Sequence, residues 1–182
     1  MSNVPTCRRK IHDGMISTMI RNVQRLDESL RSGTLLRSVL ERHEADIMEQ
    51  QQRQLLEGRS ATGEDLRPYY TEDVRPSGWF TTRQKAENYA RWKQSLSYPY
   101  TANRNPDAPN LYVTGAFYSD LRVVYTSEGV GVEGDTVSAR RIIAKYGKDA
   151  FGLCPDRWGV IFDERGAKRE TIEKAKDILW QG

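Results

Sequence analysis

The sequence LRVVYTSEGVGVEG, residues 121–134, decides the fold class of this 182-residue chain. Leu121, Val123 and Tyr125 lie at alternate positions, the spacing typical of one face of a β-strand. Residues 129–134 predict the return strand, with the hairpin turn at Ser127-Glu128-Gly129. The remaining chain predicts helices and loops, so we expect an α+β protein: N-terminal helices, a small antiparallel sheet and a C-terminal amphipathic helix.

Apolar residues at helical spacing precede the hairpin in three segments. Asp13 can cap a first helix that ends at Ser32-Gly33, and Thr34 can cap a second that continues to Gly58. Thr81 and Gln84 have the spacing of a capping box, which predicts a third helix to about Ser97.

After the hairpin, Ser138 can cap a short helix that ends at Gly147, and residues 158–162 suggest a further strand. The closing helix has an apolar face made of Ile172, Ala175, Ile178 and Leu179. We expect the core of this half of the chain to contain Leu111, Phe117, Leu121, Val123 and Ile143.

Two segments, residues 59–80 and 98–110, have prolines or glycines at short intervals. Their apolar residues follow neither helical nor strand spacing. Both contain large rings that a solvated linker does not need, so we expect ordered loops that pack on something. The predicted division is a mobile basic tail at 1–12, a helical N-terminal part at 13–58, and an α+β domain at 59–182 that carries both loops.

The composition is polar, with 37% hydrophobic and 29% charged residues and a mean hydropathy of −0.73. No run approaches the roughly 20 apolar residues of a membrane span, and the first ten residues lack the apolar segment of a signal peptide. We therefore expect no membrane association. The formal net charge is +3, so basic and acidic residues are too evenly balanced for a protein that coats DNA.

Residue types that carry chemistry are scarce. Cys7 and Cys154 are far apart in the sequence, and neither has the histidine neighbours of a zinc site. His12 lies in the tail, and His43 is expected to be a packed or partly exposed helix histidine, with Glu44 and Asp46 pointing elsewhere. We expect no catalytic residues, no metal and no cofactor.

The two loops are expected to form an interface. Trp and Tyr are enriched where proteins meet, and the candidate residues are Tyr69, Tyr70, Trp79, Phe80, Tyr98 and Tyr100. Arginines interleave with these rings, as they do in proteins that stack single-stranded nucleic acid: Arg67, Arg75, Arg83, Arg91 and Arg104. Acidic residues in the same region would repel phosphates, which favours a protein partner over nucleic acid.

From Leu111 to the end, the order of short motifs resembles the virion-morphogenesis and tail-completion family of tailed bacteriophages. The matching positions are Thr114, Gly115, Phe117, Val132, Tyr146, Gly147, Phe151 and Gly152. The resemblance covers about residues 111–182 and, more loosely, the N-terminal helices. The loops between residues 59 and 110 and the segment Cys154-Pro-Asp-Arg157 lie outside the family pattern.

The resemblance implies a structural, non-enzymatic subunit of a neck or tail-completion ring that joins head and tail around the DNA channel. Its expected partners are six or twelve copies of itself, portal or adaptor and tail proteins, and genomic DNA that passes through without sequence-specific binding. The expected location is the virion, after assembly in the bacterial cytoplasm. The alternative is a nucleic-acid-binding phage accessory protein.

Overall fold

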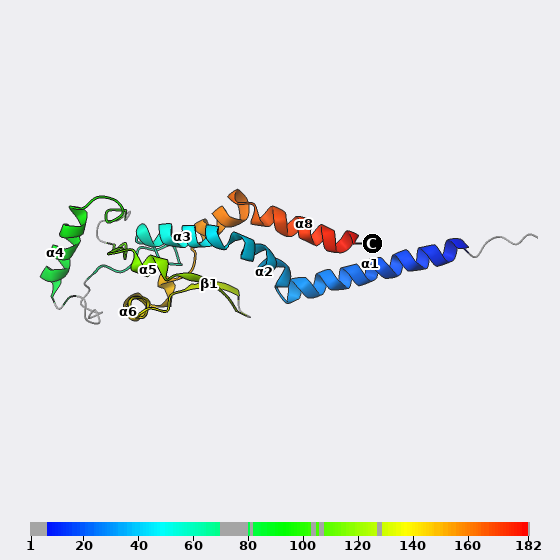
Figure 1. Cartoon of the computed structure of the whole chain (residues 1–182), viewed down its shortest axis with the longest axis horizontal. Helices are drawn as coiled ribbons and strands as arrows, with labels where there is room; N and C mark the ends of the chain where they lie inside the picture. The colour runs from blue at the N-terminus through cyan, green and yellow to red at the C-terminus, as the bar shows by residue number, and fades with distance from the viewer. Residues whose placement is uncertain are drawn as a thin grey trace, which may run out of the picture. The chain divides into compact units, whose positions relative to one another are not determined.

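A computed structural model describes the chain except for residues 1–6, 70–79, 81, 103–104, 106–107, 127–128 and 182, and the side chains of residues 7–14. Helices and one two-stranded antiparallel sheet make up its regular structure (Figure 1), which confirms the α+β fold class. The chain divides into two compact units, residues 1–42 with 166–182 and residues 43–165. The expected boundary at residue 58 is therefore wrong: the C-terminal helix belongs with the N-terminal helices.

The first unit contains α1 (Cys7–Arg31), α2 (Thr34–Leu40) and α8 (Ala167–Trp180), and each packs against the other two. Because α1 begins at Cys7, residues 7–12 are helical and do not belong to a tail. Asn22 of α1 donates from Nδ2 to the carbonyl oxygens of Leu179 at 3.1 Å and Gln181 at 2.8 Å. This side chain therefore satisfies carbonyls that the C-terminus of α8 leaves without intrahelical partners.

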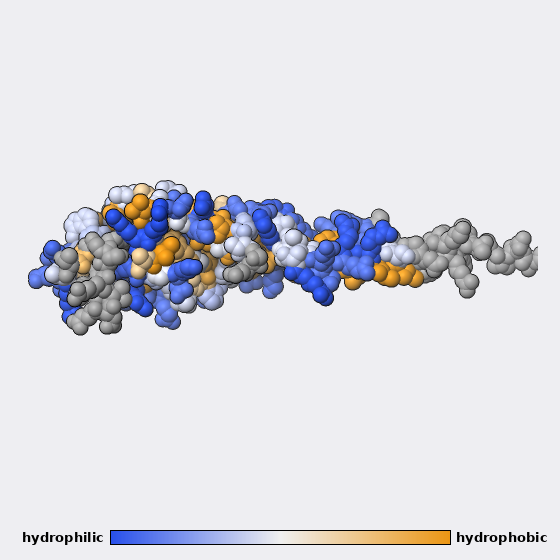
Figure 2. Space-filling model, turned by 90° about the horizontal axis from the view of Figure 1, so that it is seen from below, coloured by the Kyte–Doolittle hydropathy of each residue, from blue (hydrophilic) through white to orange (hydrophobic). Residues whose placement is uncertain are grey.

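The α8 helix ends beside Asn22, so it leaves the N-terminal half of α1 uncovered. Apolar side chains on α1 remain about half exposed: Met15 57%, Ile16 50%, Met19 51%, Ile20 54%, Val23 55% and Leu30 58%. Figure 2 shows hydrophobic colour gathered along α1 next to the grey residues at its start. The helical spacing is confirmed, but much of the apolar face is not core.

The second unit contains α3, the β-hairpin and several further helices and turns. Their bounds are η1 (Glu41–His43, a 3₁₀ turn shared with the end of the first unit), α3 (Glu44–Leu56), α4 (Arg83–Gln94), α5 (Ala116–Ser119), β1 (Arg122–Thr126), β2 (Gly129–Glu133), α6 (Val137–Tyr146), η2 (Lys148–Ala150), α7 (Pro155–Gly159) and η3 (Val160–Glu164, a π-helical turn). The predicted second helix to Gly58 thus becomes α2 and α3 with a tighter turn between them.

The predicted hairpin is confirmed, and β1 pairs with β2 so that Val123 lies opposite Val132. Just before the hairpin, Asp120 accepts the backbone N–H groups of Asp135 and Thr136 through Oδ2, both at 2.9 Å. Thr136 in turn caps α6 by accepting the N–H of Ala139 at 3.2 Å. A carboxylate thus fixes where the chain leaves the sheet.

Two predicted caps are displaced along the chain. Thr82, not Thr81, caps α4 by accepting the N–H of Lys85, and Thr136, not Ser138, caps α6. Each cap is an extended threonine whose hydroxyl accepts an N–H three residues later. Because another hydroxyl residue lies one or two positions away in each case, the sequence does not show which of the two is the cap.

The strand predicted at residues 158–162 is wrong, because this stretch forms α7 and η3. Pro155 stands at the first position of α7, where its fixed φ suits a helix and its missing N–H costs nothing. Trp158 and Phe162 lie one turn apart and their rings contact each other at 5.9 Å between centroids. Their spacing fits a helix face as well as a strand.

Three glutamines of α3 are fully buried, and all three bind the segment that follows η2. Gln51 accepts the N–H of Gly152 at 2.8 Å, while Gln54 donates to the carbonyl of Gly152 and accepts the N–H of Cys154, both at 2.8 Å. Gln50 accepts from Nη1 of Arg157 at 3.0 Å. Gln51 and Gln54 thus supply the partners that a backbone segment outside any sheet or helix needs, and Gln50 binds a side chain of α7.

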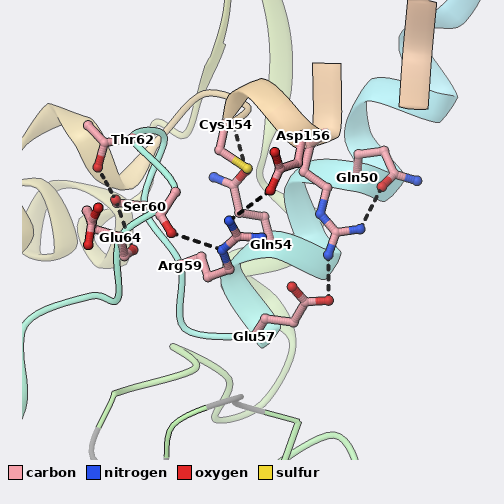
Figure 3. A network of polar contacts seen from close by, with 11 residues as sticks. Gln50, Gln54, Glu57, Arg59, Ser60, Thr62, Glu64, Cys154 and Asp156 are labelled. Carbon is pink, nitrogen blue, oxygen red and sulfur yellow. Dashed lines mark hydrogen bonds and ion pairs between the residues drawn. The ribbon is translucent and has the colours of Figure 1, made fainter. Parts of the chain in front are cut away.

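Figure 3 shows Gln50 and Gln54 of α3, and Glu57 directly after its end, on the side of the chain that carries Cys154 and Asp156. Arg157 extends the network by donating from Nη2 to Glu57 at 2.5 Å. On the other side of this chain, Arg59 donates to the carbonyl of Gly63 at 3.1 Å and pairs with Asp156 at 3.2 Å. We call Gln50, Gln51 and Gln54 the glutamine ladder.

The expected core is mostly confirmed. Leu111, Phe117 and Leu121 are buried, whereas Val123 is half-buried. In α6 the buried residue is Ile142, 2% exposed, and Ile143 is only half-buried. The helix face that meets the core is therefore turned by one residue from the expected one.

Replacing Gln54 with leucine tests the glutamine ladder. The change keeps the volume but leaves the carbonyl of Gly152 and the N–H of Cys154 without this partner. We expect Gln54→Leu to lower the free energy of unfolding by about 2–4 kcal/mol, the cost of two orphaned polar groups. Urea denaturation measures it, with the exposed Arg53→Leu of the same helix as control, expected within about 0.5 kcal/mol of wild type.

Candidate functional site

The loops of the second unit meet α4 and α6 around two buried lysines, Lys93 at 3% exposure and Lys145 at 7%. The rings of Tyr69, Tyr89 and Tyr146 and the amide of Asn110 complete the lysine–tyrosine cluster. Tyr69 comes from the first loop, Asn110 from the end of the second, and the other members from the two helices. The cluster thus joins four segments that are distant in the sequence.

Lys93 donates from Nζ to the hydroxyl of Tyr69 at 3.2 Å and to Oδ1 of Asn110. Its amine also lies 5.8 Å from the ring centroid of Tyr69 and 5.9 Å from that of Tyr89. Lys145 donates to the backbone carbonyl of Tyr69 at 2.6 Å and lies 5.0 Å from the centroid of Tyr146. Aromatic faces attract cations at these distances, which offsets part of the cost of burial.

Burial lowers the pKa of Lys93 and that of Lys145, each from 10.5 to about 8, because the charged amine loses its hydration. Burial raises the pKa of Tyr69, and the neighbouring Tyr89 raises it further. Burial likewise raises the pKa of Tyr146. The folded state therefore favours the uncharged form of every one of these groups.

Asn110, 1% exposed, organises the second loop. Its Nδ2 donates to the carbonyls of Pro99 at 3.0 Å and Tyr100 at 2.7 Å, and its Oδ1 accepts the N–H of Tyr112 at 3.2 Å. The hydroxyl of Tyr118 donates to its backbone carbonyl at 2.6 Å. One side chain thus closes the loop on itself, and Lys93 ties it to α4.

A neutral lysine amine is a nucleophile, and a pKa near 8 leaves part of the population neutral at neutral pH. Lys93, however, is buried and uses its amine to hold Tyr69 and Asn110 together. Its geometry serves to brace the loops. The buried rings continue this bracing: Tyr69 packs edge-on against Tyr89 at 5.2 Å and against Phe80 at 6.0 Å.

The predicted interface residues separate into two groups. Tyr69 is 7% exposed, so its ring belongs to the interior and that prediction is wrong. Phe80 is half-buried against Tyr89 at 5.0 Å, and Tyr100 is half-buried against Tyr112 at 5.1 Å. Tyr98 is 73% exposed and stays a predicted interface residue. Tyr70 and Trp79 lie outside the described residues.

A second exposed ring was not predicted. Trp92 on α4 is 49% exposed and contacts Tyr89 at 5.5 Å, so the internal stack of rings continues to the surface there. We call Trp92 and Tyr98 the aromatic surface. Both stand on segments that Lys93 and Asn110 fix, at the end of α4 and the start of the second loop.

The residues that carry the family resemblance mostly make internal contacts. Gly115 and Gly147 have φ of 82° and 81° beside α5 and α6, a conformation that glycine adopts without strain. Phe117 packs against Phe151 at 5.9 Å. The remaining positions are Val132, buried in the hairpin; Gly152, bound by the glutamine ladder; Thr114, exposed; and Tyr146, in the lysine–tyrosine cluster.

Other candidate groups are structural in the part of the chain that is described. His43 is 6% exposed, as expected of a packed histidine, but Asp46 does face it, with Nδ1 and Oδ2 at 3.0 Å. Cys154 is fully buried. Among the described residues, no three His, Cys, Asp or Glu side chains are placed to hold a metal ion. None of the described helices has the length and apolar content of a bilayer span.

Comparison with protein-family models, with curated proteins and with solved structures found no match to this chain.

Sequence patterns missed Lys93, Lys145 and Asn110. Lysine is almost never fully buried, so nothing in its local pattern distinguishes these two from exposed lysines. A signal for Lys93 exists in hindsight, since it lies four residues after Tyr89 and hence on the same helix face.

The buried lysines predict a pH dependence of stability. Between pH 8 and 10 the unfolded lysines bind more protons than the folded ones, so the free energy of unfolding rises with pH in this window. Lys93→Met removes one contribution, and we expect the rise between pH 8 and 10 to shrink by about 2 kcal/mol. Urea titrations at both pH values measure it.

The exposed Lys148→Met is the matched control and should keep the full rise. Above pH 10 the slope should reverse in all three proteins, because the tyrosines with raised pKa lose their protons first in the unfolded chain. A Lys93→Met protein with an unchanged slope would show that Lys93 is not buried in this way.

Proposed function

We propose that this protein is a structural subunit of a phage neck or tail-completion ring, which joins head and tail around the DNA channel without catalysing a reaction. The observation that carries the proposal is the aromatic surface, two exposed rings held on braced segments of the second unit. The order of motifs from Leu111 onward adds the phage setting. Six or twelve copies would form the ring, next to portal or adaptor and tail proteins.

Bracing matters for such a role because each immobilised side chain and loop costs binding free energy unless it is ordered beforehand. Here Asn110 closes the second loop with hydrogen bonds to Pro99 and Tyr100, the two residues that follow Tyr98. Trp92 precedes Lys93, which is fixed by two hydrogen bonds. Both rings of the aromatic surface are therefore next to anchored positions.

Nucleic-acid binding is the alternative, since exposed arginines lie on the same helix as Trp92. Arg83 faces Glu87 at 3.5 Å, and Arg91 donates to Asn88 at 2.7 Å. An arginine that is paired or bonded within its own helix is less available for a phosphate. This favours a protein partner for the aromatic surface.

Replacing Tyr98 with alanine tests the proposal. The ring is 73% exposed, so the unfolding free energy should change by no more than about 0.5 kcal/mol. Assembly should weaken by about 30-fold or more, the effect of losing a ring that anchors an interface. Native mass spectrometry of the purified chain measures the population of six-copy or twelve-copy species.

Trp180→Ala is the matched control, because Trp180 is 76% exposed and belongs to the other unit. It should leave the six-copy or twelve-copy species intact. If Tyr98→Ala instead assembles like wild type, while steep loss of DNA binding with salt appears in the same protein, the nucleic-acid alternative gains and the ring proposal fails.

A further inference from the structure

The uncovered part of α1 has an exposed apolar face. Five of its exposed apolar residues, Met15, Ile16, Met19, Ile20 and Val23, fall within nine positions. The α8 helix ends beside Asn22, so it cannot cover the turns before that residue. Contiguous exposed apolar surface on a soluble protein marks an interaction site.

The spacing of these residues identifies the kind of partner. Ile16, Met19, Val23, Leu26 and Leu30 follow one another at intervals of three, four, three and four, the a/d pattern of a heptad repeat. β-branched Ile16 and Val23 occupy a positions, and Met19 and Leu26 occupy d positions. β-branched residues at a with long unbranched or γ-branched residues at d favour a parallel pair of helices.

The g and e positions beside this part of the seam are Met15 and Ile20, both apolar and both exposed. In a parallel pair a g position faces the following e position of the partner helix, so these two residues would extend the apolar contact. Symmetry provides each pair twice.

The first unit leaves room for this partner. Asn22, Leu26 and Ser29 define the side of α1 turned to α8, and the centre of the a/d seam lies about a quarter turn away, at 100° per residue. Leu26 is half-buried and lies both on the side of α1 turned to α8 and in the a/d seam. A second helix can therefore lie beside α1 without displacing α8, as neighbouring helices do in a bundle.

We propose that the α1 face of Ile16, Met19 and Val23 binds the same face of α1 in a second copy of this chain, as a parallel helix pair. The contact is separate from the aromatic surface and does not rest on the ring proposal. A parallel pair is self-complementary, whereas a ring joins each subunit to its neighbours through two different patches, so the pair is an additional contact.

Sedimentation of the full chain over a range of concentrations tests the pairing. Val23→Glu places a charge in the seam and should raise the dissociation constant of the pair at least 30-fold. Gln24→Glu adds the same charge to the neighbouring exposed position outside the seam and should leave the constant within threefold of wild type. Circular dichroism checks that both variants keep the helix content of wild type.

Disulfide formation tests the orientation in the same full chain. Ile16→Cys in a Cys7→Ser background should form a cross-linked dimer under mild oxidation, since equivalent a positions meet only in a parallel pair. Gln24→Cys in that background should stay uncross-linked, and the fully buried Cys154 is common to both.

Three results would overturn the proposal: a wild-type chain with no pairing at any soluble concentration, pairing that Val23→Glu leaves unchanged, or efficient cross-linking at position 24 but not 16. Vesicles containing phosphatidylserine test the remaining alternative, in which the α1 face binds a lipid surface. A monomeric wild type whose binding to these vesicles is lost in Val23→Glu would assign the face to a lipid surface instead.

Discussion

Buried backbone polar groups need partners, and in the second unit the glutamine ladder of α3 provides them. The segment from Gly152 to Cys154 lies in no strand or helix, yet Gln51 and Gln54 satisfy its N–H and carbonyl groups. The α7 helix is held by the same network, because Pro155 starts α7 directly afterwards and Arg157 donates to Gln50 and Glu57. A buried polar network fixes one register where apolar packing alone tolerates several.

The lysine–tyrosine cluster imposes the same kind of constraint on the loops. Burying an amine is costly unless hydrogen bonds and aromatic faces replace its hydration, and Lys93 and Lys145 have both. The loops gain a fixed conformation in return, with Asn110 as the common partner of α4 and the second loop. Two exposed rings lie beside these anchors and need little further ordering to bind, which is the physical basis of the proposed assembly role.

Local patterns predicted the elements whose stability is local. The hairpin at residues 121–134, the closing helix that includes residues 172–179 and the α+β class follow from periodicity alone, although Ile172 of the expected helix face is exposed. The contacts between residues distant in the sequence did not follow from periodicity. Nothing near Tyr69 indicates that its ring is interior, since burial there depends on α4 and on Lys145, 76 positions away. The positions of Trp158 and Phe162 do not separate a strand from a helix, because positions four apart share a face in both structures.

The most direct test of the proposed role is the copy number of the chain in the particle. Quantitative peptide mass spectrometry on density-purified virions from the source compares it with the portal protein. The account predicts a ratio that corresponds to six or twelve copies in each virion. Absence of the chain from purified virions, with the portal protein present, would contradict it.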